Sequence, residues 1–151
     1  MRVLLISTYD LGRQPLGLAS PAAWLHRAGA EVDCVDASRE RLLDARIAAA
    51  ELVAFYLPMH TATRLAGPLI DRVRRANPLA RIAAYGLYAP INEGWLREKG
   101  TNQHFLSDVK ACPILEGSLP KLPTKRSTKS RAVAGPTSGL NESLNVKMFL
   151  L

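Results

Sequence analysis

The amino-acid sequence predicts an α/β fold built on an open, doubly wound parallel sheet. Apolar runs of strand length recur through residues 1–100 and alternate with segments that carry helix start and stop signals. The runs are apolar almost throughout, which is typical of parallel strands covered by helices on both faces. Four strand and helix pairs in succession therefore predict a flavodoxin-like, or Rossmann-like, sheet.

The first strand is expected at residues 2–7, "RVLLIS", followed by a glycine-containing loop. The first helix is expected at residues 20–29. Ser20 is its predicted N-cap and Pro21 its first helical residue, and Gly29 is its predicted C-terminal stop.

The second strand is expected at residues 30–36 and the third at residues 51–58, both rich in apolar side chains. Between them, the segment 38–50 has helical composition and begins with Ser38, a residue that caps helices well. This segment is the predicted second helix.

A third helix is expected over residues 60–78. Three apolar residues in it recur every fourth position and are predicted to share one face: Leu65, Leu69 and Val73. Pro68 lies among them and is expected to kink or restart the helix.

The fourth strand is expected at residues 80–88 and a further short helix at residues 89–100. A sheet of this type needs a fifth strand near residues 101–110, but "TNQHFLSDV" holds few apolar residues. We expect the sheet to lack a regular fifth strand.

The composition changes at about residue 100. Residues 1–100 contain 12 Arg and one Lys, whereas residues 101–151 contain 2 Arg and 5 Lys. The prediction is an α/β domain over 1–100, an uncertain edge segment over 101–116, and a disordered Lys/Ser/Pro-rich tail over 117–151. One hypothesis is that the segment after residue 100 arose by a frameshift, an altered splice junction or a fused reading frame.

The overall composition excludes several classes of protein. Apolar residues make up 48% of the 151 residues and charged residues 22%, as in globular proteins. No apolar run is long enough to cross a bilayer, and the N-terminus lacks a secretory signal, so a cytoplasmic protein without membrane contact is expected. Cys34 and Cys112 are expected to be separate thiols in such a reducing compartment.

Ligands of doubly wound sheets bind where the carboxyl ends of the strands meet. The loops expected there are residues 8–20, 57–61 and 86–90. The first contains neither the dinucleotide nor the P-loop glycine pattern, and Asp36 is better explained as a turn or N-cap residue than as a ribose ligand.

A phosphoacceptor receiver domain shares this fold but requires an aspartate at the end of its third strand, where this chain has Tyr56, Leu57 and Pro58. The remaining crevice would be lined by tyrosines, Met59 and small residues, with His60 and Gln14 as polar groups. This lining suits a large, flat, partly apolar ligand.

Two segments carry a resemblance to a known family: "LLISTYDLGRQPLGLASPAAWLHRAGAEVDCVD" and "AAELVAFYLPMHTATRLAGPLIDRVRRANPLARIAAYGLYAPIN". Residues 1–100 resemble the N-terminal cobalamin-binding (B12-binding) domain of radical S-adenosylmethionine (radical SAM) proteins. The resemblance implies that the loops after the first, third and fourth strands approach the corrin while the nucleotide tail runs beside the sheet. The cofactor-binding residues it implies are Thr8, Tyr9, Asp10, Gly12, Gln14, Gly17, Pro58, Met59, His60, Thr61, Gly86, Leu87 and Tyr88.

The chain departs from the resembled family in three ways. Asp10 is followed by Leu11 and Gly12, so the cobalt-ligating histidine of the D-x-H-x-x-G pattern is missing, and no metal ligand is predicted. The usual Gly-Gly turn after the fifth strand is missing too. Two cysteines cannot supply the three thiolates of the radical SAM iron–sulfur cluster. The expectation is a truncated cobalamin module without catalysis of its own, paired with a separate radical SAM catalytic chain.

The alternative is a small α/β interaction domain whose basic tail contacts nucleic acid or another anionic partner. The net charge of +7 favours it, since residues 101–151 carry 7 Lys or Arg against 3 Asp or Glu. No aromatic residue stands among the basic residues of 121–131, so nucleic acid is disfavoured as a partner. A third alternative, an enzyme with a hidden nucleophile, has no recognisable triad to support it.

Overall fold

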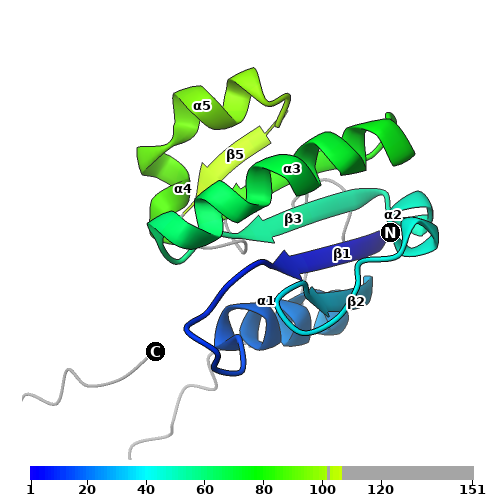
Figure 1. Ribbon diagram of the computed structural model, residues 1–151. Coiled ribbons are helices and arrows are strands. Elements are labelled where there is room, and N and C mark those ends of the chain that lie inside the picture. The colour runs from blue at the N-terminus through cyan, green and yellow to red at the C-terminus, as the bar shows by residue number, and fades with distance from the viewer. Residues whose placement is uncertain (102, 107–151) are drawn as a thin grey trace, which may run out of the picture.

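The computed structural model describes residues 1–101 and the backbone of residues 103–106. Strands and helices alternate along this part of the chain (Figure 1). The strands are β1 (Arg2–Ser7), β2 (Glu31–Asp36), β3 (Leu52–Tyr56), β4 (Arg81–Tyr85) and β5 (Gln103–Leu106). The helices are α1 (Leu16–Arg27), α2 (Asp44–Ala49), α3 (His60–Ala76), α4 (Tyr88–Ile91) and α5 (Glu93–Glu98).

The five strands form one sheet in the order β2-β1-β3-β4-β5, and every neighbouring pair is parallel. The chain moves from β1 outward to β2, then crosses back to β3 and continues to β5. The strand order therefore reverses between β1 and β3, which confirms the predicted doubly wound fold. A fifth strand is present, but it has only four residues, and its pairing with β4 is irregular between Ala83 and Ala84.

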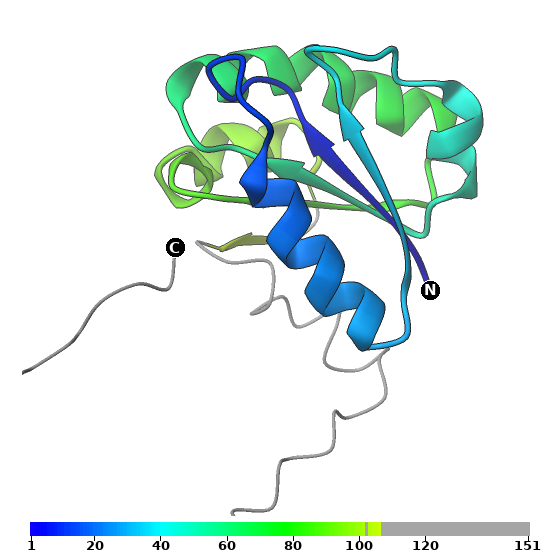
Figure 2. The same cartoon turned by 90° about the horizontal axis from the view of Figure 1, so that it is seen from below.

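Helices lie on both faces of the sheet (Figure 2). An apolar cluster fills the space between the sheet and the helices on each face. Alternate residues of each strand point to opposite faces, so Leu5 of β1 packs with α1 while Leu4 packs with the helices of the other face. That larger cluster includes Phe55 of β3 and Ile70 of α3, both fully buried. Each such side chain contributes about 1.5–3 kcal/mol to folding by leaving water.

Helix α1 begins at Leu16, five residues before the predicted first helical residue, Pro21. Its N-cap is Pro15, and Ser20 lies inside the helix, so the predicted capping role of Ser20 is wrong. The buried face of the helix explains the early start, because Leu18, Pro21 and Leu25 follow one another at helical spacing. The C-terminal end is as predicted: Gly29 follows the helix with φ 87°, the left-handed conformation that favours glycine.

Helix α2 covers only half of the predicted segment, and Ser38 does not cap it. The Ser38 amide and hydroxyl both donate to Asp36 Oδ1, at 3.0 and 2.6 Å. This local hydrogen bonding makes a turn directly after β2, so the helix begins only at Asp44. The interpretation of Asp36 as a turn residue is confirmed.

Helix α3 runs through Pro68 without a break, so the predicted restart does not occur. The predicted apolar face is confirmed in part: Val73 is buried in the core and the partly buried Leu69 packs against it, but Leu65 is exposed. The side chains that pack on the sheet are Ala62, Ala66, Ile70 and Val73. Leu65 directly precedes the buried Ala66, and Leu69 directly precedes the buried Ile70. One residue corresponds to a rotation of about 100° around the helix, so both leucines point away from the centre of the buried face.

The predictions for the tail over 117–151, for Cys112 and for most of the edge segment 101–116 lie outside the described residues. Among the residues that the structure describes, no helix is both long enough and apolar enough to cross a membrane.

Candidate functional site

The carboxyl ends of the parallel strands bring three connections to one edge of the sheet (Figure 1). They are the long connection from β1 to α1 and the short ones from β3 to α3 and from β4 to α4. All thirteen residues implied by the resemblance lie in these connections or in the first two residues of the helices that follow. We call this edge the switch edge, because the strand order reverses there between β1 and β3.

The β1–α1 connection contains a tight turn in an uncommon backbone conformation. The Arg13 amide donates to the Asp10 carbonyl at 2.8 Å, and both central residues have positive φ, 49° at Leu11 and 71° at Gly12. Glycine adopts this region freely, but for leucine it costs about 1 kcal/mol. The Leu11 side chain is 62% exposed, so packing within the described residues does not account for this conformation.

Arg39, in the connection between β2 and α2, forms a hydrogen bond to this turn. Arg39, which follows β2, donates from Nη2 to the Gly12 carbonyl at 2.6 Å, and its Nε lies 3.7 Å from Asp36 Oδ2. The sequence did not identify Arg39 as a site residue, because it is 27 positions from Gly12 and only the sheet order brings the two together.

Four neighbouring strands end in polar residues that lie side by side across the sheet. Asp36, Ser7, Tyr56 and Tyr85 are successive Cα partners across β2, β1, β3 and β4. Paired residues of parallel strands point to the same face, and here it is the face covered by α1, since Tyr56 and Tyr85 belong to the α1-side cluster. Ser7 is a second site residue that the sequence did not reveal; its only signal was a polar residue closing an apolar run.

The two tyrosines pack against the first turn of α1 at Gly17. A Cβ atom at Gly17 would lie 2.1 Å from Tyr56 Cζ, so the Tyr56 ring occupies the space that a side chain would need. The Tyr85 hydroxyl donates to the Gly17 carbonyl at 2.8 Å, and the two ring centroids are 5.4 Å apart. Burial, together with the nearby negative charge of Asp10, raises the pKa of the Tyr56 hydroxyl.

Gly86, in the β4–α4 connection, lies against the backbone of Leu57 in the β3–α3 connection. It has φ 104°, and a Cβ there would lie 2.8 Å from the Leu57 carbonyl oxygen. The Leu57 amide donates to the Tyr85 carbonyl at 2.7 Å, and the Tyr88 amide donates to the Leu57 carbonyl at 3.0 Å. Gly86 therefore allows the β3–α3 and β4–α4 connections to lie against each other.

Thr8 and His60 differ in how accessible their side chains are to a ligand. Thr8 is buried, and its hydroxyl donates to the Ala62 carbonyl at 2.8 Å, which ties the end of β1 to α3. His60 is the first residue of α3 and is exposed. Gly12, in contrast to Gly17, has open space around its Cβ position.

Exposed apolar side chains surround the switch edge. Leu11 and Leu16 belong to the β1–α1 connection and the start of α1, and Leu87 and Ile91 belong to the β4–α4 segment. Each of the four is more than 60% exposed. We call these four residues the apolar rim.

Two hollows flank the neighbouring strand ends. One, of about 540 Å³, lies beside α1 and β2 and is lined in part by Gln14, Cys34 and Arg39. The other, of about 390 Å³, lies on the opposite face and is lined in part by Thr8 and Leu65. Cys34 has a free thiol, and burial raises its pKa, so it is mainly protonated at neutral pH.

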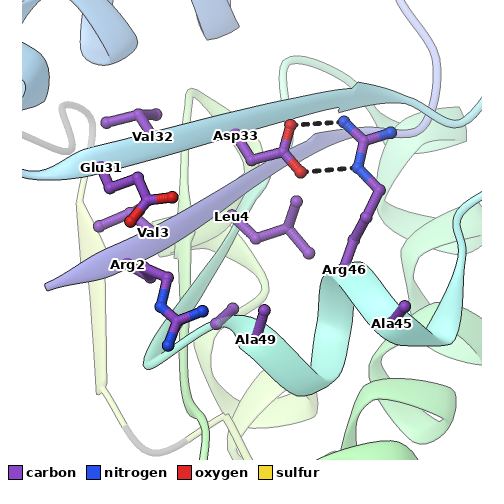
Figure 3. A pocket seen from close by; sticks show the side chains of 10 residues that line it. Arg2, Val3, Leu4, Glu31, Val32, Asp33, Ala45, Arg46 and Ala49 are labelled. Carbon is purple, nitrogen blue, oxygen red and sulfur yellow. Dashed lines mark hydrogen bonds and ion pairs between the residues drawn. The ribbon is translucent and has the colours of Figure 1, made fainter.

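A third hollow lies away from the switch edge, beside the first halves of β1 and β2 (Figure 3). Its volume is about 470 Å³, and alanines of α2 and charged side chains line it. Arg46 of α2 holds Asp33 of β2 in a bidentate pair at 2.6 and 2.5 Å and also donates to the Cys34 carbonyl at 2.8 Å. This pairing lowers the pKa of the Asp33 carboxyl and occupies a backbone acceptor of the edge strand, as expected of edge protection.

No group of three or more His, Cys, Asp or Glu residues that could hold a metal ion exists within residues 1–101 as the structure describes them. The sequence matches no family model, and comparisons with curated proteins and with solved structures find no match. The fold and the switch edge define a doubly wound α/β domain of flavodoxin-like type.

Proposed function

We propose that this chain is the cobalamin-binding module of a radical SAM-type protein, without the catalytic iron–sulfur domain. The observation that carries the proposal is the apolar rim at the reversal of strand order, with Leu11 held outward in a strained conformation. Strain of this kind clusters at binding sites. The resemblance of residues 1–100 to the B12-binding family supports cobalamin as the ligand.

The residues at the switch edge fit a corrin better than a charged ligand. The apolar rim offers Leu11, Leu16, Leu87 and Ile91 to an apolar ring system, and the open space beside Gly12 lets a ligand approach the backbone. Gln14 and Tyr88 are the nearby side chains that could form hydrogen bonds to the corrin amides. Thr8, Gly17 and Gly86 would support the site from within, because their contacts are made inside the protein.

The β1–α1 connection would not supply a ligand to cobalt. Gly12 stands where the related cobalamin proteins have histidine, and its left-handed backbone forms part of the Asp10–Arg13 turn. When bound, cobalamin would supply a cobalt centre that carries an alkyl group. The chain's own residues would hold and orient it and present its outer face to a second protein, a separate radical SAM catalytic chain in the cytoplasm.

Titration with hydroxocobalamin, followed by corrin absorption and by calorimetry, tests the proposal. Leu16→Glu or Leu87→Glu should weaken binding at least about tenfold, because each places a charge against the apolar ring. Leu79→Glu is the matched control, since Leu79 is 93% exposed at the opposite edge of the sheet, and it should bind as the unaltered protein does. Absence of binding at tens of micromolar, or equal losses in all three variants, contradicts the proposal.

Nucleic-acid binding measured on the same protein distinguishes this function from the alternative, an interaction domain with a basic tail. Salt-sensitive binding of DNA or RNA that disappears with residues 117–151, in a protein that ignores hydroxocobalamin, would favour a basic interaction module instead.

A further inference from the structure

Arg39 joins the end of β2 to the turn in the β1–α1 connection. Its Nη2 donates to the Gly12 carbonyl at 2.6 Å, and its Nε lies 3.7 Å from Asp36 Oδ2. The Arg39 backbone is held at the same place, because its amide donates to the Asp36 carbonyl at 2.9 Å. Asp36 is fixed in turn by the amide and the hydroxyl of Ser38. The guanidinium therefore reaches the β1–α1 turn from a fixed base at the carboxyl end of β2.

The conformation of this turn is not explained by its own contacts. The hydrogen bond from the Arg13 amide to the Asp10 carbonyl closes it, but turns closed in this way occur with either sign of φ at their second residue. That residue is Leu11, with φ 49°, although leucine favours negative φ. The Leu11 side chain is largely exposed, so packing within the described residues does not hold it there either.

Arg39 supplies a constraint that accounts for this conformation. It binds the carbonyl of Gly12, the residue directly after Leu11. Rotation of Leu11 to negative φ would redirect the chain just before Gly12 and move this carbonyl away from the guanidinium. No other side chain among the described residues hydrogen-bonds to residues 10–13.

We propose that Arg39 is a positioning residue of the switch edge, which selects the form of the turn that presents Leu11 and the Gly12 backbone to a ligand. The inference rests on the proposed function for the identity of the ligand, because Leu11 belongs to the apolar rim and the space beside Gly12 is open. A loop held in its binding form before the ligand arrives binds more tightly, since less order has to be imposed on it. Without Arg39 a smaller fraction of the protein holds that form, and the apparent affinity falls in proportion.

The first test examines the turn in the full chain without a ligand. The nuclear Overhauser effect between the amide and Hα hydrogens of Leu11 is strong at positive φ, where the two hydrogens are close. One hydrogen bond shifts an equilibrium about fivefold, so Arg39→Ala should lose about half of this signal or more. Adding Leu11→Asn to Arg39→Ala should restore the signal at position 11, because asparagine adopts positive φ readily.

Arg41→Ala is the matched control for both tests. Arg41 is exposed in the same connection, and it has no hydrogen bond or ion pair to a residue that the structure describes. Its replacement removes the same charge and should leave the Leu11 signal and ligand binding unchanged. Arg39 is itself largely exposed, so Arg39→Ala should fold, and its melting temperature checks this.

The second test uses hydroxocobalamin. Arg39→Ala should weaken binding about fivefold, and the loss should lie in the association rate, because fewer free molecules hold the turn in the binding form. A residue that only contacts the ligand would change the dissociation rate instead. An unchanged Leu11 signal in Arg39→Ala, or a reduced signal with unchanged cobalamin binding, overturns the inference while the proposed function stands. If the unaltered protein binds no corrinoid, the proposed function fails, and the Leu11 signal alone decides whether Arg39 selects the turn.

Discussion

The Tyr85 hydroxyl donates to the Gly17 carbonyl at 2.8 Å, across 68 residues of sequence. In a regular helix that carbonyl would accept the amide four residues later, but residue 21 is a proline and has no amide hydrogen. Pro21 therefore leaves an acceptor free in the first turn of α1, and Tyr85 of β4 uses it. The pair joins the start of α1 to the switch edge.

Tyr85→Phe should lower the free energy of unfolding by about 1–3 kcal/mol, because it leaves the Gly17 carbonyl without its partner. In a Pro21→Ala background the loss should be smaller, since the restored amide at position 21 can donate to Gly17. Denaturant unfolding of the two single variants and the double variant measures the coupling. Purely additive losses would show that Pro21 and Tyr85 do not act on the same carbonyl.

Gly17→Ala should destabilise the protein by about 1–3 kcal/mol, because the new methyl group overlaps the Tyr56 ring. Gly94→Ala is the matched control within α5: apart from its chain neighbours and the helix's own backbone, no atom lies within 4 Å of its Cβ position, and alanine there should stabilise by about 0.5–1 kcal/mol. In a Tyr56→Ala background, Gly17→Ala should become stabilising as well. A loss of the same size with and without the Tyr56 ring would contradict the packing described.

Leu11→Asn should raise the free energy of unfolding by about 1 kcal/mol, because asparagine adopts a left-handed backbone more readily than leucine. Leu16→Asn is the control: it replaces another exposed leucine whose backbone is helical, and it should give no gain. Thermal unfolding should show a rise of about 4–8 °C for Leu11→Asn alone. Cobalamin binding should weaken in the same variant, since it loses part of the apolar rim.

The Asp33–Arg46 pair predicts a dependence of stability on pH. Arg46 lowers the pKa of Asp33 in the folded protein, so the pair stabilises above the unfolded pKa of about 3.9, and the gain is lost as pH falls through the folded pKa. Asp33 is half-exposed, which limits the contribution to about 0.2–1 kcal/mol. Asp33→Asn should melt at a lower temperature than the unaltered protein at about pH 7, and this difference should shrink as the pH falls below about 4. A difference that persists in acid would point to another cause.

The sheet was predictable because buried parallel strands are continuous apolar runs that need no tertiary information. Gly29 was predictable for a similar local reason, the left-handed residue that ends a helix. The start of α1 was not, because Ser20 and Pro21 form a strong local capping signal that the packing of Leu18 overrides.

The contacts inside the candidate site could not be predicted from sequence, although the resemblance implied Gly17 as a site residue and tyrosines were expected to line the crevice. The relationship of Ser7, Gly17 and Tyr56 exists only once β1, β3 and α1 are placed together. Arg39 joins them through the same strand order. The meeting of the three connections after β1, β3 and β4 was predictable, because the carboxyl ends of parallel strands lie at one edge of the sheet.

Amide hydrogen exchange with and without hydroxocobalamin tests the central claim, that the switch edge binds the cofactor, most directly. Binding should slow exchange in the connections that follow β1, β3 and β4 and leave the opposite edge, at Ala48–Glu51 and Leu79–Arg81, unchanged. Unchanged exchange at the switch edge, or slowed exchange at the opposite edge alone, would contradict the claim.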